Sequence, residues 1–277
     1  MNPEVSIIIT TYNRRAALAE LLEALLRQTY RNFEVIIVND AGESVDKVIA
    51  LYKSLNIKRI DFERNAKHVH ARNAGLRVAT GNWIMLCDDD DILLPDHIER
   101  MLQQSSDADL LYSDVEIVHY AWNDDHTMRI PRSRRLFAYH YDAQGMREFS
   151  TFVSSGCLYR RAVHERIGEF DHTMYHYWDW DFILRVEEAA LRIKRVPVAS
   201  ALYAFADAAG SNLSDDLTDM RSYLDKLCDK HGLGYLPTKN FYLLLEEPGV
   251  RQREATSEII WDGSPIRSRW SVANNTR

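Results

Sequence analysis

Short apolar runs alternate with segments of helical periodicity along the first third of the chain. Four runs have the length and composition of buried strands, at residues 5–10, 33–38, 57–62 and 83–86. Between them, apolar residues recur every three or four positions, which predicts helices over residues 16–27, 44–55 and 70–79. Strand and helix in this order predict an α/β fold with a mostly parallel, Rossmann-like sheet flanked by helices.

The rest of the chain has a weaker pattern. We expect strands at residues 108–113, 156–160 and 196–205, and helices at residues 161–167, 179–190 and 215–231. Residues 119–149 are polar and irregular, with a cluster of arginines at Arg129, Arg132, Arg134 and Arg135. Such a stretch fits either a solvated basic loop or a lid over a binding site.

Four aspartates, Asp88 to Asp91, directly follow the apolar run at residues 83–86. Carboxylates crowded at a strand end repel one another and lose hydration. A divalent cation would offset their charge, and Mg²⁺ commonly shares one or two protein carboxylates with the phosphate groups of a substrate. The same residues also fit a solvated acidic loop before a helix that we expect near Pro95 and Asp96. From the run alone, both interpretations stay open.

Polar residues also end two other predicted strands. Thr10, Thr11, Tyr12 and Asn13 follow the first strand, and Asn39 and Asp40 follow the second. Ligands of parallel α/β sheets bind beyond the carboxyl ends of the strands. The three polar clusters therefore predict one binding crevice.

Two further side chains are candidates for this crevice. Arg72 could pair with phosphate, although a surface ion pair would also explain it. Asp179 lies within an aromatic segment, residues 175–181, and a carboxyl group among aromatic rings is a candidate for a raised pKa and for general-base catalysis. A helix cap flanked by core aromatics would explain the same segment.

Charge and composition limit the classes of binding partner and the cellular compartment that the sequence suits. The net charge of −7 and the pI of about 5.8 argue against nucleic acid as a partner. No apolar run approaches the roughly 18 residues of a membrane span, and the chain enters its first strand without a signal segment. Three widely spaced cysteines suit a reducing compartment. We therefore expect a cytoplasmic protein, and peripheral contact with a membrane stays open.

Taken in order, these motifs resemble the family 2 glycosyltransferases of the GT-A fold. The resemblance covers about residues 4–214 and rests on five segments: VSIIITTYNR (5–14), QTYRNFEVIIVND (28–40), ARNAG with ATGNWI (71–84), DDDD with PD (88–96), and GEFD with WDWD and an arginine (168–185). Each segment alone is a weak signal, whereas the ordered set is specific. It implies a GT-A domain over residues 1–214, with a nucleotide-binding half over 1–114 and an acceptor half over 115–214. Residues 215–277 would form a C-terminal helical extension and tail.

The resemblance also implies a role for each candidate residue. Six side chains would surround the nucleotide: Thr10, Tyr12, Asp40, Arg72, Asp88 and Asp89. Asp90, with Asp88 beside it, would bind Mn²⁺ or Mg²⁺, and Asp179 would be the catalytic base. The implied reaction is inverting transfer of a sugar from a nucleoside diphosphate, UDP by family frequency, to a saccharide or lipid-linked acceptor. Polysaccharide or glycoconjugate synthesis would be its setting.

The chain departs from the family pattern at three places. Trp178 stands where the family often has Glu, and Asn39 stands where it has Asp. Residues 203–211 lack the His or Arg that many members carry there, and the cluster Arg132–Arg135 could replace it as a mobile clamp on the diphosphate.

Three other functions compete with this interpretation. A sugar-nucleotide nucleotidyltransferase would normally show a glycine-rich loop after the first strand, and residues 10–15 contain no glycine. A non-catalytic nucleotide-sugar-binding module would keep the crevice and lack a competent base. A glycoside hydrolase is disfavoured because its pair of carboxylates needs no metal–nucleotide site.

Overall fold

A computed structural model of the chain describes residues 2–205, 217–239 and 247–274. Over these residues the strands form one ten-stranded sheet in the order β10-β9-β6-β8-β4-β1-β2-β3, with β5 paired to β9 and β7 paired to β6. The strands are β1 (Val5–Thr11), β2 (Phe33–Asn39), β3 (Ile57–Asp61), β4 (Trp83–Asp88), β5 (Ile92–Leu93), β6 (Leu110–Trp122), β7 (Arg129–Phe137), β8 (Leu158–Arg160), β9 (Ile193–Phe205) and β10 (Glu258–Ile259). The predicted α/β fold with a mostly parallel sheet is confirmed.

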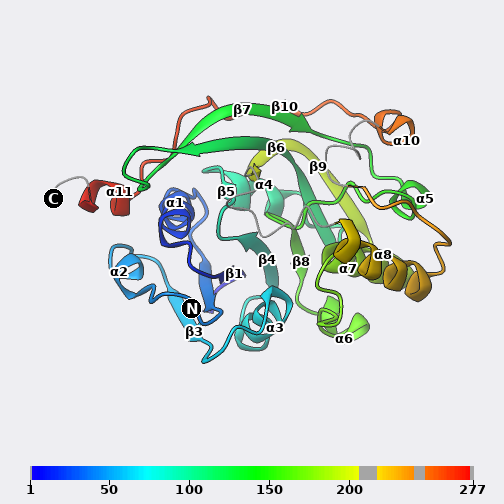
Figure 1. Cartoon of the computed structure of the whole chain (residues 1–277), viewed down its shortest axis with the longest axis horizontal. Helices are drawn as coiled ribbons and strands as arrows, with labels where there is room; N and C mark the ends of the chain where they lie inside the picture. Colours follow the sequence, from blue (N-terminus) through cyan, green and yellow to red (C-terminus); the bar gives the residue numbers. More distant parts are fainter. Residues whose placement is uncertain (1, 206–216, 240–246, 275–277) are drawn as a thin grey trace.

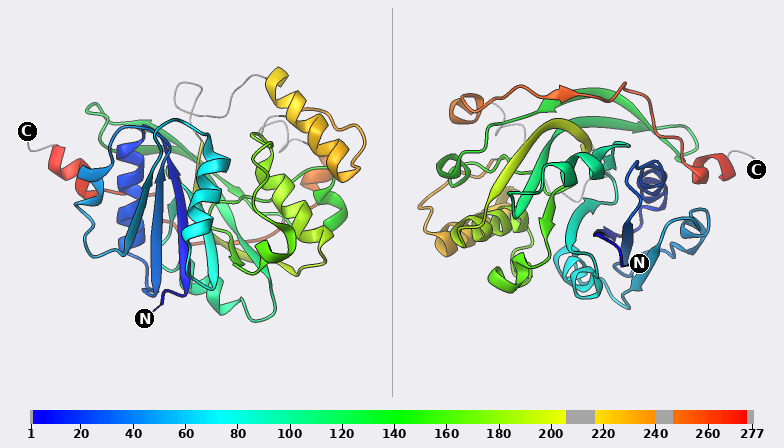
Figure 2. Two further views of the ribbon diagram at one scale, coloured as in Figure 1. Left: turned by 90° about the horizontal axis from the view of Figure 1, so that it is seen from below. Right: turned by 180° about the vertical axis from the view of Figure 1, so that it is seen from behind.

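Helices cover both faces of this sheet (Figures 1 and 2). They are α1 (Arg15–Leu26), α2 (Asp46–Ile49), α3 (His68–Val78), α4 (His97–Gln103), α5 (Ala143–Met146), α6 (Val163–Ile167), α7 (Trp178–Glu188), α8 (Leu217–His231), α10 (Pro248–Arg251) and α11 (Arg269–Asn274). The helices predicted over residues 16–27, 70–79 and 179–190 correspond to α1, α3 and α7. No described helix is both long and apolar enough to span a membrane.

The central strands are apolar on both sides because both of their faces are covered. Successive side chains of a strand point to opposite faces, so Ile7 and Ile9 pack with Leu18 of α1 while Ile8 packs with Leu76 of α3. All of these residues except Leu76 are essentially inaccessible to solvent. The two core clusters fix the position of the central strands relative to the helices. They therefore also fix where the carboxyl ends of these strands lie.

The register of β1 aligns the polar strand ends. β1 pairs in parallel with β2 on one side and with β4 on the other. Thr10 lies opposite Asp88 of β4, and Thr11 lies opposite Asn39 of β2. The predicted meeting of the three polar clusters at one edge of the sheet is confirmed.

The prediction of an irregular stretch over residues 119–149 is wrong for much of its length. β6 continues to Trp122 and pairs with β7 in an antiparallel hairpin. This hairpin lies along the upper edge of the molecule in Figure 1. β7 exposes most of its middle residues, so it lacks the apolar alternation of a buried strand. Pro131, which argues against a strand in a sequence, faces the irregularity between His119 and Tyr120, where a missing N–H is tolerated.

The helix predicted over residues 44–55 is also wrong in length, because α2 ends at Ile49. After this residue the backbone tightens into turns with i→i−3 hydrogen bonds. The tightening turns the ring of Tyr52 into the core, where its hydroxyl donates to the carbonyl oxygen of Ala19 at 2.7 Å.

The C-terminal residues pack back onto the domain. α8 corresponds to the helix predicted over residues 215–231, and it lies beside α7 (Figures 1 and 2). β10 pairs in parallel with β9, and α11 packs against α1. The predicted division of the chain at residue 214 stays a prediction. Residues 206–211, which belong to the segment where many family members carry a His or Arg, lie outside the described residues.

Candidate active site

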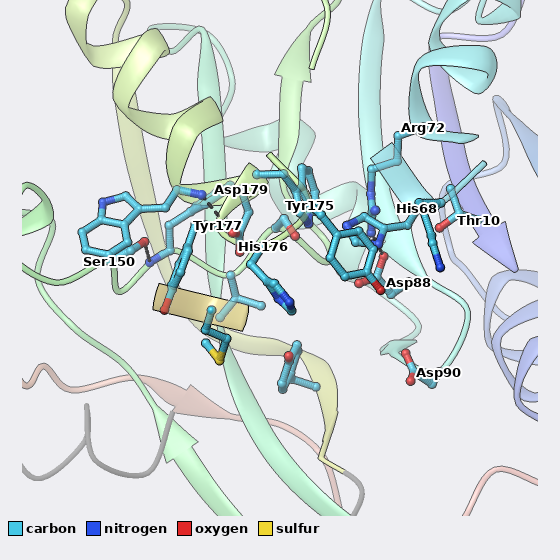
Figure 3. A pocket seen from close by; sticks show the side chains of 18 of the residues that line it. Thr10, His68, Arg72, Asp88, Asp90, Ser150, Tyr175, His176, Tyr177 and Asp179 are labelled. Carbon is cyan, nitrogen blue, oxygen red and sulfur yellow. Dashed lines mark hydrogen bonds and ion pairs between the residues drawn. The ribbon is translucent and has the colours of Figure 1, made fainter. Parts of the chain in front are cut away.

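A cavity of about 450 Å³ lies at the carboxyl ends of the central strands and extends to α7 and α8. All eight side chains that the sequence predicts for the site line it: Thr10, Tyr12, Asp40, Arg72, Asp88, Asp89, Asp90 and Asp179. Figure 3 shows Thr10, Asp88 and Asp90 on one side of the cavity and Asp179 on the other, with Tyr175 between them. The structure therefore brings the predicted residues together around one cavity.

Asp40 holds the turn that leads into α3. Its buried carboxylate accepts hydrogen bonds from the backbone N–H groups of Ala66 (2.6 Å) and Lys67 (2.9 Å). Lys67 has a φ of 74°, a left-handed conformation that is uncommon for a residue with a side chain. The two bonds stabilise this turn, which places Lys67 and His68 at the edge of the cavity.

Arg72 brings a buried positive charge into the cavity from α3. Its Nη2 donates to Asp88, and its guanidinium lies 3.9 Å from the centre of the Trp178 ring. Its Nη1 is buried and has no hydrogen-bond partner among the described residues. Arg72 is therefore oriented by Asp88 and Trp178 and keeps one donor nitrogen for a ligand.

The four aspartates of the acidic run have different environments. Asp88 and Asp90 are partly exposed, with side-chain exposures of 37% and 26%, and both line the cavity. Asp89 is buried, and burial raises its pKa to about 7, although Arg14 opposes that rise. Asp91 is buried and turned toward β9, where its Oδ1 accepts the N–H of Ala204 at 2.7 Å. Two of the four carboxylates can therefore meet a ligand in the cavity.

Arg14, at the start of α1, holds the acidic run from the other side. Its Nη1 lies 3.1 Å from Oδ1 of Asp89 and 2.6 Å from Oδ2 of Asp90. This residue ends the first resemblance segment, and no spacing rule pairs it with a run 75 positions away. Arg14 and Arg72 together supply two positive charges beside the crowded aspartates.

The donor atoms at this end of the cavity suit a hard divalent cation. Carboxylate oxygens of Asp88 and Asp90 are accessible, and oxygen is the ligand type that Mg²⁺ and Mn²⁺ prefer. Within the described residues, no group of three His, Cys, Asp or Glu side chains is arranged to hold a metal. A cation here would have to share its coordination with a ligand, as Mg²⁺ does with substrate phosphates.

Asp179 lies in the first turn of α7, among the aromatic side chains that line the cavity. Its Oδ1 accepts the backbone N–H of Trp180 at 2.9 Å. Burial is the main cause that raises its pKa to about 6, and the nearby Arg72 opposes this rise. A carboxylate with this pKa is ionised at neutral pH and more basic than an ordinary aspartate, which suits a general base.

Some lining residues have no equivalent in the sequence prediction. His68 lies against Tyr175, with ring centres 4.7 Å apart, and burial lowers its pKa to about 3, so its imidazole is neutral. Met220 and Leu224 of α8 also line the cavity. An isolated His and two apolar residues carry no sequence signal for a site, because only the tertiary fold brings them to it.

The arginine cluster does not form the predicted clamp. None of Arg129, Arg132, Arg134 and Arg135 lines the cavity. Arg129 is buried, where it pairs with Glu20 of α1 at 2.6 Å and donates to the backbone carbonyl of Asp90 at 2.6 Å. Arg134 donates to the carbonyl of Trp261 on the outer side of the hairpin. These side chains lie on β7, and none of them turns into the cavity.

Comparison with known sequences places these features in a family. The family model for Glycosyl transferase family 2 matches residues 6–168. The chain is 55% identical over 267 residues to the uncharacterized glycosyltransferase YwdF of Bacillus subtilis, which covers 96% of this chain and 98% of YwdF. It is also 25% identical to the glycosyltransferase GlyA of Streptococcus pneumoniae, over 60% of this chain and 26% of GlyA.

Solved structures show the same fold. Residues 1–349 of S. aureus TarS, in complex with UDP-GlcNAc, match with a TM-score of 0.64 at 19% identity, over 82% of this chain and 66% of that one. The mannosyltransferase PcManGT of Pyrobaculum calidifontis, in complex with GDP-Man and Mn²⁺, matches with a TM-score of 0.59 at 16% identity, over 86% and 66%. At these identities the likeness is one of fold, and it confirms the GT-A prediction.

Proposed function

Because the chain belongs to glycosyl transferase family 2, we propose that it transfers a sugar from a nucleoside-diphosphate donor to an acceptor hydroxyl, with inversion at the anomeric carbon. One observation carries the proposal. Asp179, a carboxylate with a raised pKa, lines the same cavity as the acidic run and the ends of β1 and β2. A donor bound at the strand ends would place its sugar between the acidic run and Asp179.

The nucleotide end of this cavity is assigned to Thr10, Tyr12 and the turn that Asp40 holds. A nucleotide lies beyond the carboxyl ends of parallel strands in such folds, and these residues occupy those ends. We propose UDP as the nucleotide. The TarS structures with UDP-GlcNAc and with UDP support this choice, and the GDP-Man complex of PcManGT makes GDP the alternative.

Arg72 and the acidic run are assigned to the diphosphate. The unpartnered Nη1 of Arg72 can donate to a phosphate oxygen while Nη2 stays on Asp88. Asp90 and Asp88 would hold Mn²⁺ or Mg²⁺, which would supply positive charge to offset the charge that develops on the departing diphosphate. Asp89 pairs with Arg14 behind these two residues, which ties the run to the start of α1.

Asp179 is assigned the role of general base. Its carboxylate accepts the proton of the acceptor hydroxyl while that oxygen attacks the anomeric carbon. The bond from the anomeric carbon to the diphosphate breaks in the same step, and its electron pair leaves with the diphosphate. A single displacement from the opposite face inverts the configuration.

A donor panel tests the proposed activity. UDP-, GDP- and dTDP-sugars are incubated with the protein, saccharide or lipid-linked acceptors and Mn²⁺, and release of the nucleoside diphosphate is measured together with the glycosylated product. Asp179→Asn should lower kcat for transfer by about 10²–10⁴-fold and leave nucleotide binding unchanged. Glu148→Gln, which removes an exposed carboxyl group from the same cavity, is the matched control.

The panel also separates the alternatives. Unchanged turnover in Asp179→Asn would refute the role of this residue as base. Donor binding without any transfer would indicate a non-catalytic nucleotide-sugar-binding module. Formation of a sugar nucleotide from a sugar phosphate and a nucleoside triphosphate would instead indicate a nucleotidyltransferase.

We place this activity in the cytoplasm, in polysaccharide or glycoconjugate synthesis. The nucleotide-sugar donor supports that setting. Peripheral contact with a membrane would follow if the acceptor is lipid-linked. Transfer to an acceptor in lipid vesicles, compared with transfer to the same sugar without its lipid, distinguishes the two kinds of acceptor.

A further inference from the structure

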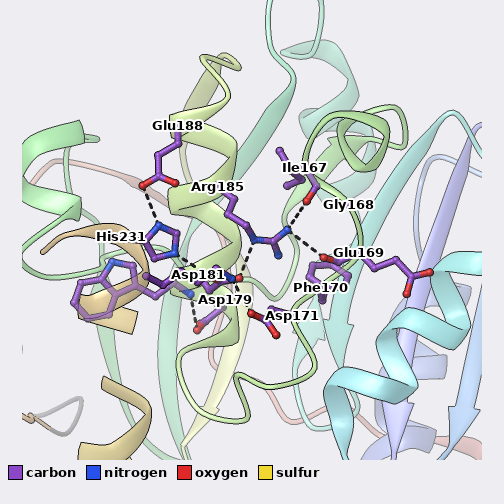
Figure 4. Close-up of polar contacts among 12 residues, drawn as sticks. Ile167, Gly168, Glu169, Phe170, Asp171, Asp179, Asp181, Arg185, Glu188 and His231 are labelled. Carbon is purple, nitrogen blue, oxygen red and sulfur yellow. Dashed lines mark hydrogen bonds and ion pairs between the residues drawn. The ribbon is translucent and has the colours of Figure 1, made fainter. Parts of the chain in front are cut away.

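The helix α8 reaches the active site from outside the region that the family model matches. Met220, in its first half, and Leu224, at its middle, line the cavity. Leu224 and Cys228 belong to the same core cluster as Trp178 and Trp180, which flank Asp179 on α7. The last residue of α8, His231, packs against α7 as well, as Figure 4 shows. The second half of α8 therefore packs along the helix that carries the proposed base.

Asp179 and Asp181 lie on opposite sides of α7. Two residues along an α-helix correspond to a rotation of about 200°. Asp179 faces the cavity, while Asp181 is fully buried on the other side. Three cationic side chains surround Asp181: Arg185 of the same helix (2.8 Å), Lys230 (2.6 Å) and His231 (2.9 Å). A shift in this buried cluster would turn or translate the first turn of α7, and Asp179 would move with it.

The contacts of His231 require a positively charged ring. Its Nε2 lies 2.9 Å from Oδ1 of Asp181, and its Nδ1 lies 2.9 Å from Oε1 of Glu188. An ionised carboxylate only accepts hydrogen bonds, so both ring nitrogens must donate. A neutral imidazole has one N–H group and can satisfy only one of these partners. The C-terminal end of α8 also favours a cation at this position.

The surroundings of His231 keep this charge in place. Its ring is 1% exposed. The charged groups around it come from three elements: Asp181, Arg185 and Glu188 of α7, Lys230 of α8, and Arg147, which follows α5 and donates to the backbone carbonyl of His231. Lys230 also pairs with Asp171 at 2.7 Å, which ties α8 to the loop before α7. The cluster therefore joins four segments of the chain.

We propose that His231 is a positioning residue for catalysis, which holds Asp179 in place by clamping Asp181 and Glu188 of α7 to the end of α8. This inference rests on the proposed role of Asp179. His231 does not touch the substrate, and it acts through α7 alone. The geometry of a general base tolerates little error, since a displacement of about 1 Å can lower a rate by about 10²-fold.

His231→Gln tests the clamp, because a glutamine amide cannot donate to both carboxylates in this arrangement. We expect kcat for transfer to fall by about 10- to 100-fold while the affinity for UDP and the donor KM stay unchanged. The acidic limb of the pH profile should move to lower pH, because a looser α7 exposes Asp179 to water. Amide hydrogen exchange should become faster in peptides from α7 and stay unchanged in peptides from α3.

Asp225→Asn is the matched control on α8. Asp225 forms an exposed pair with Arg221 on the same helix and does not contact α7. This variant should match the wild type in every readout. If His231→Gln does not fold, Lys230→Met takes its place, since it removes one partly exposed cation from Asp181.

Different outcomes would refute the proposed role of His231 and the proposed glycosyltransferase activity. Unchanged exchange in α7 or an unchanged kcat in His231→Gln would overturn the clamp. Loss of UDP affinity in step with kcat would also overturn it, because the effect would then extend to the whole domain. A wild-type protein that transfers no sugar from any donor would instead refute the proposed function, and the exchange measurement remains decisive for the clamp in that case.

Discussion

Replacing Asp179 with Asn is expected to stabilise the protein while it lowers kcat for sugar transfer by about 10²–10⁴-fold. Burial raises the pKa of this carboxyl group from 3.8 to about 6, which means that the folded state disfavours its ionised form. A shift of about two pKa units corresponds to at most about 3 kcal/mol of free energy of unfolding at neutral pH. Asp179 lines an open cavity, so we expect about 1–2 kcal/mol after allowance for solvent screening. An asparagine of the same shape removes the charge and keeps the oxygen that accepts the N–H of Trp180.

The pH dependence of this gain has a definite sign. The folded state binds the Asp179 proton more tightly than the unfolded state, so the wild type loses stability as pH rises from about 4 to about 6. Asn does not titrate, so the advantage of the variant should be largest above pH 7. It should fall to about half at pH 5, where the folded wild type is mostly protonated at this position.

Thermal unfolding at pH 7.5 and at pH 5 measures the effect. The Tm of Asp179→Asn should exceed that of the wild type by about 2–4 °C at pH 7.5, with a smaller difference at pH 5. Glu148→Gln, at an exposed position of the same cavity, should show neither difference. A lower Tm for Asp179→Asn, or a difference that does not depend on pH, would refute the reasoning that burial disfavours this charge.

Two further variants test the site, and a third, with its control, tests a buried ion pair outside it. Asp90→Asn should abolish the gain in Tm that Mn²⁺ adds to UDP, with the Tm of the free protein unchanged within about 2 °C, and an unchanged gain would exclude Asp90 as a ligand. Arg72→Lys keeps the charge but loses the planar group on the indole ring, so UDP affinity measured by calorimetry should fall by about tenfold. Arg129→Met leaves Glu20 buried without its cation, and urea unfolding should show a loss of about 3–5 kcal/mol. Arg132→Met, at an exposed position of the same strand, should change the free energy of unfolding by less than about 0.5 kcal/mol.

The alternating pattern of the first half predicted the sheet and the edge at which its polar residues meet. Parallel strands joined by helices all point their carboxyl ends the same way, so the alignment of Thr10 with Asp88 follows from the order of the elements. This part of the fold depends on local periodicity and on a topology that has few alternatives. The site residues at strand ends could be found for the same reason.

Other features depend on contacts between parts of the chain that are distant in sequence. The local pattern of apolar residues does not predict such contacts. Arg129 resembles its exposed neighbours in the sequence, and only the pairing of β6 with β7 turns its side chain toward Glu20. His231 lies 50 positions from Asp181, and no spacing rule connects them. The hairpin itself was missed because a strand that is exposed along its middle has little apolar alternation to detect.

The crowding of four aspartates is a weaker argument for a metal than it is in the sequence alone. Arg14 and Arg72 already offset part of the charge, and Asp91 is held by a backbone N–H group from β9. A run whose charge is partly offset by arginines depends less on a cation to fold. The case for a metal therefore depends on Asp88 and Asp90, whose partly exposed oxygens face a cavity where a diphosphate would complete the coordination. It follows that the metal should bind with the nucleotide rather than before it, because the protein alone supplies too few oxygens.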